Sequence, residues 1–127
     1  MMVAPRRVSQ RYTAEPEFAA VARARLVEYL RDLELTEERQ FAILYATGEA
    51  LANAIEHGTT SPGECFNFRI ERRGGHLRVQ IESTGCWQAF EPSEERGRGI
   101  PIMEALADQV DITTHTGGTI VHLSFRL

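Results

Sequence analysis

Three polar side chains at four-residue intervals are the clearest chemical signal in this chain: Glu49, Asn53 and His57. In a helix, residues four apart share one face, so a carboxylate, an amide and an imidazole would form a single ridge. The alternative is an ordinary solvated helix face. Asparagine is a poor residue for a helix interior, which weakens that alternative, so the spacing marks a candidate site.

A second candidate is the segment Arg96-Gly97-Arg98-Gly99, which directly precedes an apolar run. If that run is a helix, its first N–H groups would attract an anion and the arginines would supply positive charge. Glycine would let a phosphate approach the backbone closely. Glycines also precede helices in simple tight turns, so the segment predicts either a phosphate pocket or such a turn.

Two short segments at predicted strand ends complete the set of polar candidates. Ser83-Thr84-Gly85 follows one apolar alternation, and Gly118-Thr119 opens the last one. Each segment by itself is typical of a turn.

Two long helices are predicted to carry and support the polar ridge. The first begins near Glu15, with Pro16 in its first turn, where the missing N–H needs no partner. The second runs from a capping hydroxyl at Thr36 to His57. The predicted buried stripes are Phe18, Ala22, Leu26, Tyr29, Leu30 and Leu33 in the first helix and Phe41, Leu44, Tyr45, Leu51, Ala52 and Ile55 in the second.

Alternating apolar and polar residues predict strands in most of the remaining chain. A short strand is expected at 8–12, and 66–70 and 77–81 form a hairpin around Gly74-Gly75. After a short apolar helix at 100–107, the stretches 110–115 and 119–127 form a second hairpin. The sum is an α+β two-layer sandwich, in which about three helices cover one face of a mixed, mostly antiparallel sheet.

The composition excludes several functional classes. All 14 basic residues are arginine, and the absence of lysine excludes a Walker-type P-loop and a Schiff-base enzyme. The net charge of −4 argues against a general nucleic-acid binder, and the two cysteines show no zinc-type spacing. No apolar run approaches the roughly 20 residues of a membrane span, so a cytoplasmic protein with one domain over residues 1–127 is expected.

In this order and spacing, these motifs resemble the Bergerat-fold ATPases, the superfamily of gyrase-type, Hsp90-type and histidine-kinase ATP-binding domains. Within it, the sequence is most similar to the stand-alone anti-sigma-factor serine/threonine kinases of bacterial partner-switching systems. The similarity covers nearly the whole chain, from the first predicted helix to Leu127. It implies the Bergerat ATP-binding fold, with ATP and Mg²⁺ as the bound groups.

The resemblance also implies roles for the helical ridge. Glu49 would be the general base for the attacking hydroxyl, and Asn53 would hold Mg²⁺. One amide ligand is enough, because Mg²⁺ keeps several waters and takes other contacts from phosphates. His57 matches a variable basic position near the phosphates, and the alternative for it is a surface histidine near the helix end.

The remaining motifs match the family's nucleotide-binding elements. Gly97 and Gly99 correspond to the glycine box of a phosphate lid, and Arg98 or Arg96 would stabilise charge on the transferred phosphoryl group. Thr119 corresponds to the family's terminal Gly-Thr, whose hydroxyl helps to bind the adenine edge.

One position departs from the family pattern. Family members have Asp-x-Gly after the hairpin, and the aspartate accepts a hydrogen bond from the adenine amino group, whereas this chain has Ser83-Thr84-Gly85. Glu82 is the alternative acid, but strand alternation would turn it to the other face. With Ser83 at this position, loss of the charge-assisted bond costs about 1–3 kcal/mol, roughly 10- to 100-fold in affinity.

The function implied by the resemblance is that of a partner-switching kinase. Such a protein transfers the γ-phosphoryl group of ATP to a serine or threonine of a STAS-type anti-anti-sigma factor and otherwise sequesters a sigma factor. A homodimer is expected by analogy, with no direct nucleic-acid or membrane contact. Because Ser83 replaces the acid, the alternative is a non-catalytic partner-binding module with a degraded nucleotide site.

Overall fold

Residues 7–57, 64–83, 99–115 and 117–127 are described by a computed structural model of the chain. The helices and strands follow in the order β1 (Arg7–Thr13), α1 (Pro16–Leu30), α2 (Glu37–His57), β2 (Cys65–Arg73), β3 (His76–Ser83), α3 (Gly99–Leu106), β4 (Gln109–His115) and β5 (Gly118–Arg126). A single 3₁₀ turn, Arg31–Leu33, joins α1 to the loop before α2.

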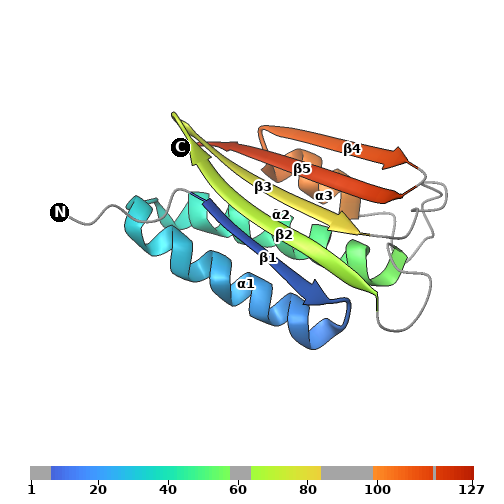
Figure 1. Cartoon of the computed structure of the whole chain (residues 1–127). Coiled ribbons are helices and arrows are strands. Elements are labelled where there is room, and N and C mark those ends of the chain that lie inside the picture. Colours follow the sequence, from blue (N-terminus) through green and yellow to red (C-terminus); the bar gives the residue numbers. More distant parts are fainter. Residues whose placement is uncertain (1–6, 58–63, 84–98, 116) are drawn as a thin grey trace.

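The five strands form one sheet in the order β1-β2-β3-β5-β4, and the helices cover one of its faces (Figure 1). This arrangement confirms the predicted α+β sandwich. Every described pairing is antiparallel, so the expected mixed sheet is wrong in that detail. The reason is the final hairpin, which inserts β5 between β3 and β4 and so separates the two strands that could have been parallel neighbours.

The residues predicted to begin the two long helices do so in the structure. Proline occupies the first turn of α1, with Glu15 as its N-cap. At α2, the Thr36 hydroxyl accepts a hydrogen bond of 3.1 Å from the backbone N–H of Arg39, as expected of a capping side chain. Glu37 and Glu38 lie in the same first turn, where carboxylates interact favourably with the helix dipole.

The buried face of α2 matches the predicted stripe only in part, since Leu51 is buried but both aromatic residues are exposed. Phe41 and Tyr45 are 58% and 40% exposed, and their rings contact each other on the outer surface with centroids 5.3 Å apart. The buried hydrophobic residues of this helix are Ala42, Ile43, Ala46, Ala50, Leu51 and Ala54. Alanine at every fourth position lets a helix backbone lie close to its neighbours, so small residues and not the aromatic ones form this contact.

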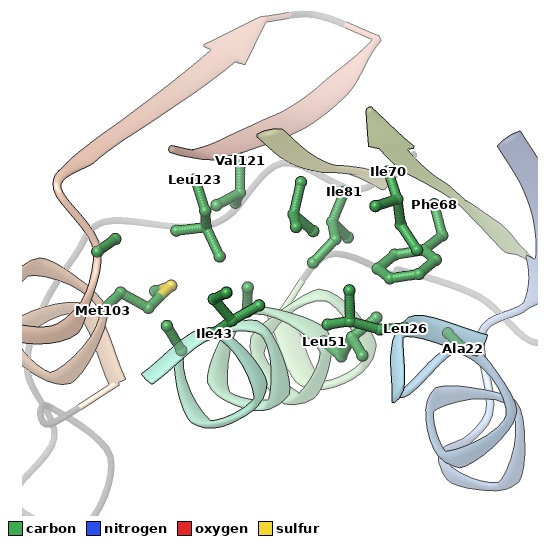
Figure 2. Packing of buried hydrophobic residues seen from close by; sticks show 14 of the residues in the cluster. Ala22, Leu26, Ile43, Leu51, Phe68, Ile70, Ile81, Met103, Val121 and Leu123 are labelled. Carbon is green, nitrogen blue, oxygen red and sulfur yellow. The ribbon is translucent and has the colours of Figure 1, made fainter. Parts of the chain in front are cut away.

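One hydrophobic cluster joins the two layers (Figure 2). Figure 2 shows Ile43 and Leu51 of α2 beneath the sheet residues Ile81 and Leu123, with Met103 of α3 on one side. Leu26 of α1 packs on the other side. Because α2 lies between α1 and α3 and contacts both, its position relative to the sheet is determined on three sides.

A polar cluster fastens the start of α2 to the last strand. The Asp108 carboxylate accepts a hydrogen bond of 2.6 Å from the backbone N–H of Arg126 and lies 3.2 Å from the guanidinium of Arg39. Arg39 also donates to the backbone carbonyl of Arg126 at 2.8 Å. The bond from the Arg126 N–H, with the positive charge of Arg39, holds the pKa of Asp108 below its usual value.

We predict that Asp108 contributes stability near neutral pH that is lost in acid. Because its pKa is lower in the folded chain than the unfolded value of 3.8, this contribution is present above that value and disappears as the pH falls through the folded pKa. Asp108→Asn should lower the free energy of unfolding by about 1 kcal/mol at pH 7, a modest loss because the side chain is 39% exposed. Urea denaturation at several pH values measures the difference, which should shrink toward pH 3; a constant difference contradicts the assignment.

The side chain of Thr47 is fully buried on α2, and its hydroxyl has no hydrogen-bond partner among the described residues. An unsatisfied buried hydroxyl is costly, and valine has nearly the same shape and helix propensity. Thr47→Val should therefore raise the free energy of unfolding by about 1 kcal/mol in urea denaturation. The control Thr47→Ser keeps the hydroxyl, deletes a methyl group and should lose about 1 kcal/mol. Destabilisation by valine would mean that the hydroxyl has a partner.

Candidate functional site

Several element ends meet at one end of the sandwich. Figure 1 places the C-terminal end of α2, the end of β3 and the beginning of β5 toward the same end of the molecule. β3 and β5 are adjacent strands, and α2 contacts both of them as well as α3. The predicted site residues on these elements are thereby directed to one region of the molecule.

Buried polar side chains concentrate on these same elements. In the described part of the chain, the buried polar or charged residues are Thr47 and Asn53 on α2, Ser83 on β3 and Thr119 on β5. Burial of a polar group is unfavourable unless it has a partner, so an otherwise hydrophobic core retains such groups for a reason. Three of these four residues are ones that the sequence motifs single out.

Ser83 and Thr119 are directly opposite each other in the β3–β5 pairing. Their exposed fractions are 1% and 0%, and they share the helix-facing side of the sheet with Ile81 and Val121. The Ser83 hydroxyl donates to the backbone carbonyl of Thr119 over 3.4 Å, a long and therefore weak hydrogen bond. The sheet thus ends in two neighbouring hydroxyls beneath the helix layer.

Glu82 lies on the opposite face of the sheet. Its carboxylate accepts a hydrogen bond of 3.3 Å from the side-chain amide of Asn67, its cross-strand neighbour on β2. The predicted strand alternation is therefore confirmed, and of the two residues it is Ser83 that faces the helices. On that face, the neighbour of Ser83 on β2 is Phe66, which is fully buried.

On α2, Asn53 is buried, with 8% of its surface exposed, and Glu49 one turn earlier is partly buried. At about 100° per residue, Asn53 lies about 70° from the centre of the buried face and Glu49 about 110°, on the same flank. An amide at the core boundary and a carboxylate at the rim therefore share one side of the helix. His57 is the last residue of α2, and its side chain lies outside the described residues.

The predicted phosphate segment is described only at its end. Gly99 is the first residue of α3, which confirms that a helix follows the glycines, with Pro101 in its first turn. Gly85, Arg96, Gly97 and Arg98 lie outside the described residues. Their roles in phosphate binding and charge stabilisation stay predictions.

The donor set suits a nucleotide with its magnesium ion better than a metal held by protein alone. Among the described residues, no group of three histidine, cysteine, aspartate or glutamate side chains could hold a metal ion. One amide oxygen, on Asn53, can complete the shell of a Mg²⁺ whose other ligands are phosphate oxygens and water. Ser83 and Thr119 offer neutral donors and acceptors in an apolar setting, which suits the edge of a nucleobase.

The sequence motifs missed one feature of the helix layer. A groove of about 550 Å³ runs between α1 and α2, on the flank of α2 away from Asn53. It is lined mainly by small and aliphatic residues, among them Ala20, Ala24, Val27, Gly48 and Ala52. Arg23 and Glu56 also line the groove, and its position on the other flank of α2 separates it from the candidate site. Among the described residues, no helix is both long enough and apolar enough to span a membrane.

Comparison with known protein families gives a match over most of the chain. The family model described as "Histidine kinase-like ATPase domain" matches residues 12–125. A curated relative, the anti-sigma F factor of Pasteuria penetrans, is 28% identical over 136 residues, covering 95% of this chain and 91% of the relative.

Solved structures show the same architecture. A crystal structure of the RsbU and RsbW domains of a Mycobacterium tuberculosis protein superimposes with a TM-score of 0.80 at 25% identity. The match covers 98% of this chain but 33% of that longer chain. The histidine kinase domain of a blue-light activated histidine kinase from Erythrobacter litoralis shares the fold, with a TM-score of 0.57 at 23% identity. This match covers 71% of the present chain and 45% of the other.

Proposed function

The chain belongs to the histidine kinase-like ATPase domain family, with relatives among bacterial anti-sigma factors, and from this membership we propose its function. It is an anti-sigma-factor serine/threonine kinase that binds Mg-ATP and phosphorylates a STAS-type anti-anti-sigma factor. The observation that carries the proposal is the burial of Asn53 on α2 and of the Ser83–Thr119 pair on the sheet, which are three of the four buried polar side chains among the described residues.

Asn53 is the proposed magnesium ligand. Its burial holds the amide in place on a long helix that packs on the sheet and on α3, so little ordering of the side chain is needed when the ion binds. When bound, Mg-ATP supplies the phosphoryl group and the positive charge that accompanies it. Ser83 and Thr119 lie on the sheet, opposite α2, and bind the hydrogen-bonding edge of the adenine base.

Glu49 is the proposed general base. It lies one turn before Asn53 on the same side of α2, and its partial burial keeps it near the core boundary and within reach of solvent and of an incoming protein. From there, its carboxylate would accept the proton of the partner's serine or threonine hydroxyl as that oxygen bonds to the γ-phosphorus of ATP and the bond from this phosphorus to ADP breaks. Arg98 or Arg96, beside the lid glycines Gly97 and Gly99, is proposed to stabilise the transferred group.

The wider assignment follows the relatives' names. The similarity to an anti-sigma F factor and to an RsbW domain supports a sigma factor and its STAS-type antagonist as the partners of this chain. We also propose a cytoplasmic homodimer that contacts neither nucleic acid nor membrane directly. His57 is proposed to lie near the phosphates.

The second candidate function is a non-catalytic module that binds the same partners without nucleotide. The serine at position 83, in place of an acid, is the observation that favours it. Calorimetry with ATP and Mg²⁺ separates the two candidates, since a kinase requires measurable binding and the module shows none at millimolar nucleotide.

We predict that Glu49→Gln strongly slows phosphate transfer and leaves ATP binding unchanged. The amide keeps the shape of the carboxylate but cannot accept the proton, so phosphate transfer should fall by about 100-fold or more. The measurement uses radiolabelled ATP and the STAS-type protein encoded by a neighbouring gene, with ATP affinity measured in parallel.

The matched control for this experiment is Glu56→Gln, which removes a carboxylate from an exposed position nearly two turns further along α2. It should transfer phosphate at the wild-type rate. Wild-type activity in Glu49→Gln would contradict the assignment of the base, and the absence of transfer by the wild-type chain to any neighbouring STAS-type protein would contradict the kinase proposal.

A further inference from the structure

The base-binding edge of the proposed nucleotide site is made of neutral hydroxyls. We propose that Ser83 makes this site tolerant of the group at position 6 of a purine, so that it binds 6-oxo purine nucleotides nearly as well as ATP. The inference rests on the proposed function, which directs the base to the Ser83–Thr119 pair.

The chemical basis is the donor and acceptor inventory of the two side chains. An ionised carboxylate only accepts hydrogen bonds, so it would favour the 6-amino group of adenine and repel a 6-oxo group. A hydroxyl both donates and accepts. Ser83 can therefore accept from an amino group or donate to a carbonyl, and Thr119 has the same capacity.

The geometry makes the switch between these two roles inexpensive. The Ser83 hydroxyl donates to the Thr119 carbonyl over 3.4 Å, near the limit for a hydrogen bond. With adenine, the hydroxyl keeps this bond and accepts from the amino group. With a 6-oxo purine, rotation about the Cβ–Oγ bond turns the proton toward the purine oxygen, and only the weak bond is lost.

No carboxylate lies beside Ser83 on the helix-facing side of the described strands, so these strands supply no group that would restore a preference for adenine. On the helix-facing side, its cross-strand neighbours are Phe66 and Thr119, both fully buried. The adjacent acid, Glu82, lies on the opposite face and accepts a hydrogen bond from Asn67. Among the described residues of β2, β3 and β5, only neutral groups therefore face the edge of the purine base.

The test compares Mg-ATP with Mg-inosine triphosphate by calorimetry on the full chain. Hypoxanthine differs from adenine in the 6-oxo group and the accompanying N1 proton, so the comparison isolates the groups that Ser83 and Thr119 would contact. The two dissociation constants should agree within about tenfold. Binding of ATP with inosine triphosphate weaker by about 100-fold or more would overturn the inference and leave the proposed function standing.

Variants at this position sharpen the test. Ser83→Ala removes the hydroxyl and should weaken both nucleotides by a similar factor of about 3- to 10-fold, which leaves their ratio unchanged. Ser83→Asp should strengthen ATP binding and weaken inosine triphosphate, so that their ratio rises to about 100-fold. A ratio that does not move in Ser83→Asp would overturn the inference.

Two controls keep the outcomes distinct. Glu82→Gln changes the adjacent carboxylate on the opposite face and should leave both affinities unchanged. Thermal denaturation verifies that each variant folds, and if the buried aspartate prevents folding, the wild-type ratio and Ser83→Ala decide the question. If the folded wild-type chain binds neither nucleotide at millimolar concentration, the proposed function fails, and this inference fails with it.

Discussion

The close packing of α2 on the sheet is the constraint on which the rest of the structure depends. Alanines at positions 42, 46, 50 and 54 form much of the contact face, and short side chains there allow the helix to lie near β3 and β5. That packing leaves Asn53 buried at the boundary of the core and Glu49 at its rim. A larger residue in the alanine series would push the helix away from the sheet and change the burial of both side chains.

Much of the fold could be predicted from the sequence because its local signals agree with one another. The alternation in 66–70 and 77–81 corresponds to β2 and β3, and the Thr36 cap and Pro16 mark the starts of the two long helices. The same alternation distinguishes Ser83 from Glu82, since consecutive strand residues face opposite sides of a sheet. Local periodicity is sufficient to predict which face of an element is buried wherever the other face is clearly polar.

The errors arise where tertiary packing, and not hydrophobicity, decides which face is buried. Phe41 and Tyr45 are larger than the alanines near them, so periodicity placed both rings in the core and missed the alanines, although Leu51 of the same predicted stripe is buried. The burial of Asn53 could not be predicted from that stripe, although the four-residue spacing did identify the residue. The antiparallel sheet follows from the insertion of β5, which no local pattern reports. The roles of Glu49, Asn53 and the lid residues depend on a bound nucleotide and stay predictions.

The central claim is that one nucleotide is held between α2 and the adjoining ends of β3 and β5. The most direct measurement is an NMR titration of the isotope-labelled chain with Mg-ATP, following the side-chain amide of Asn53 and the backbone amides of Ser83 and Thr119. We expect all three signals to shift together and to saturate with a single dissociation constant. Unchanged signals at these three positions, while others in the chain shift and saturate, would contradict the account.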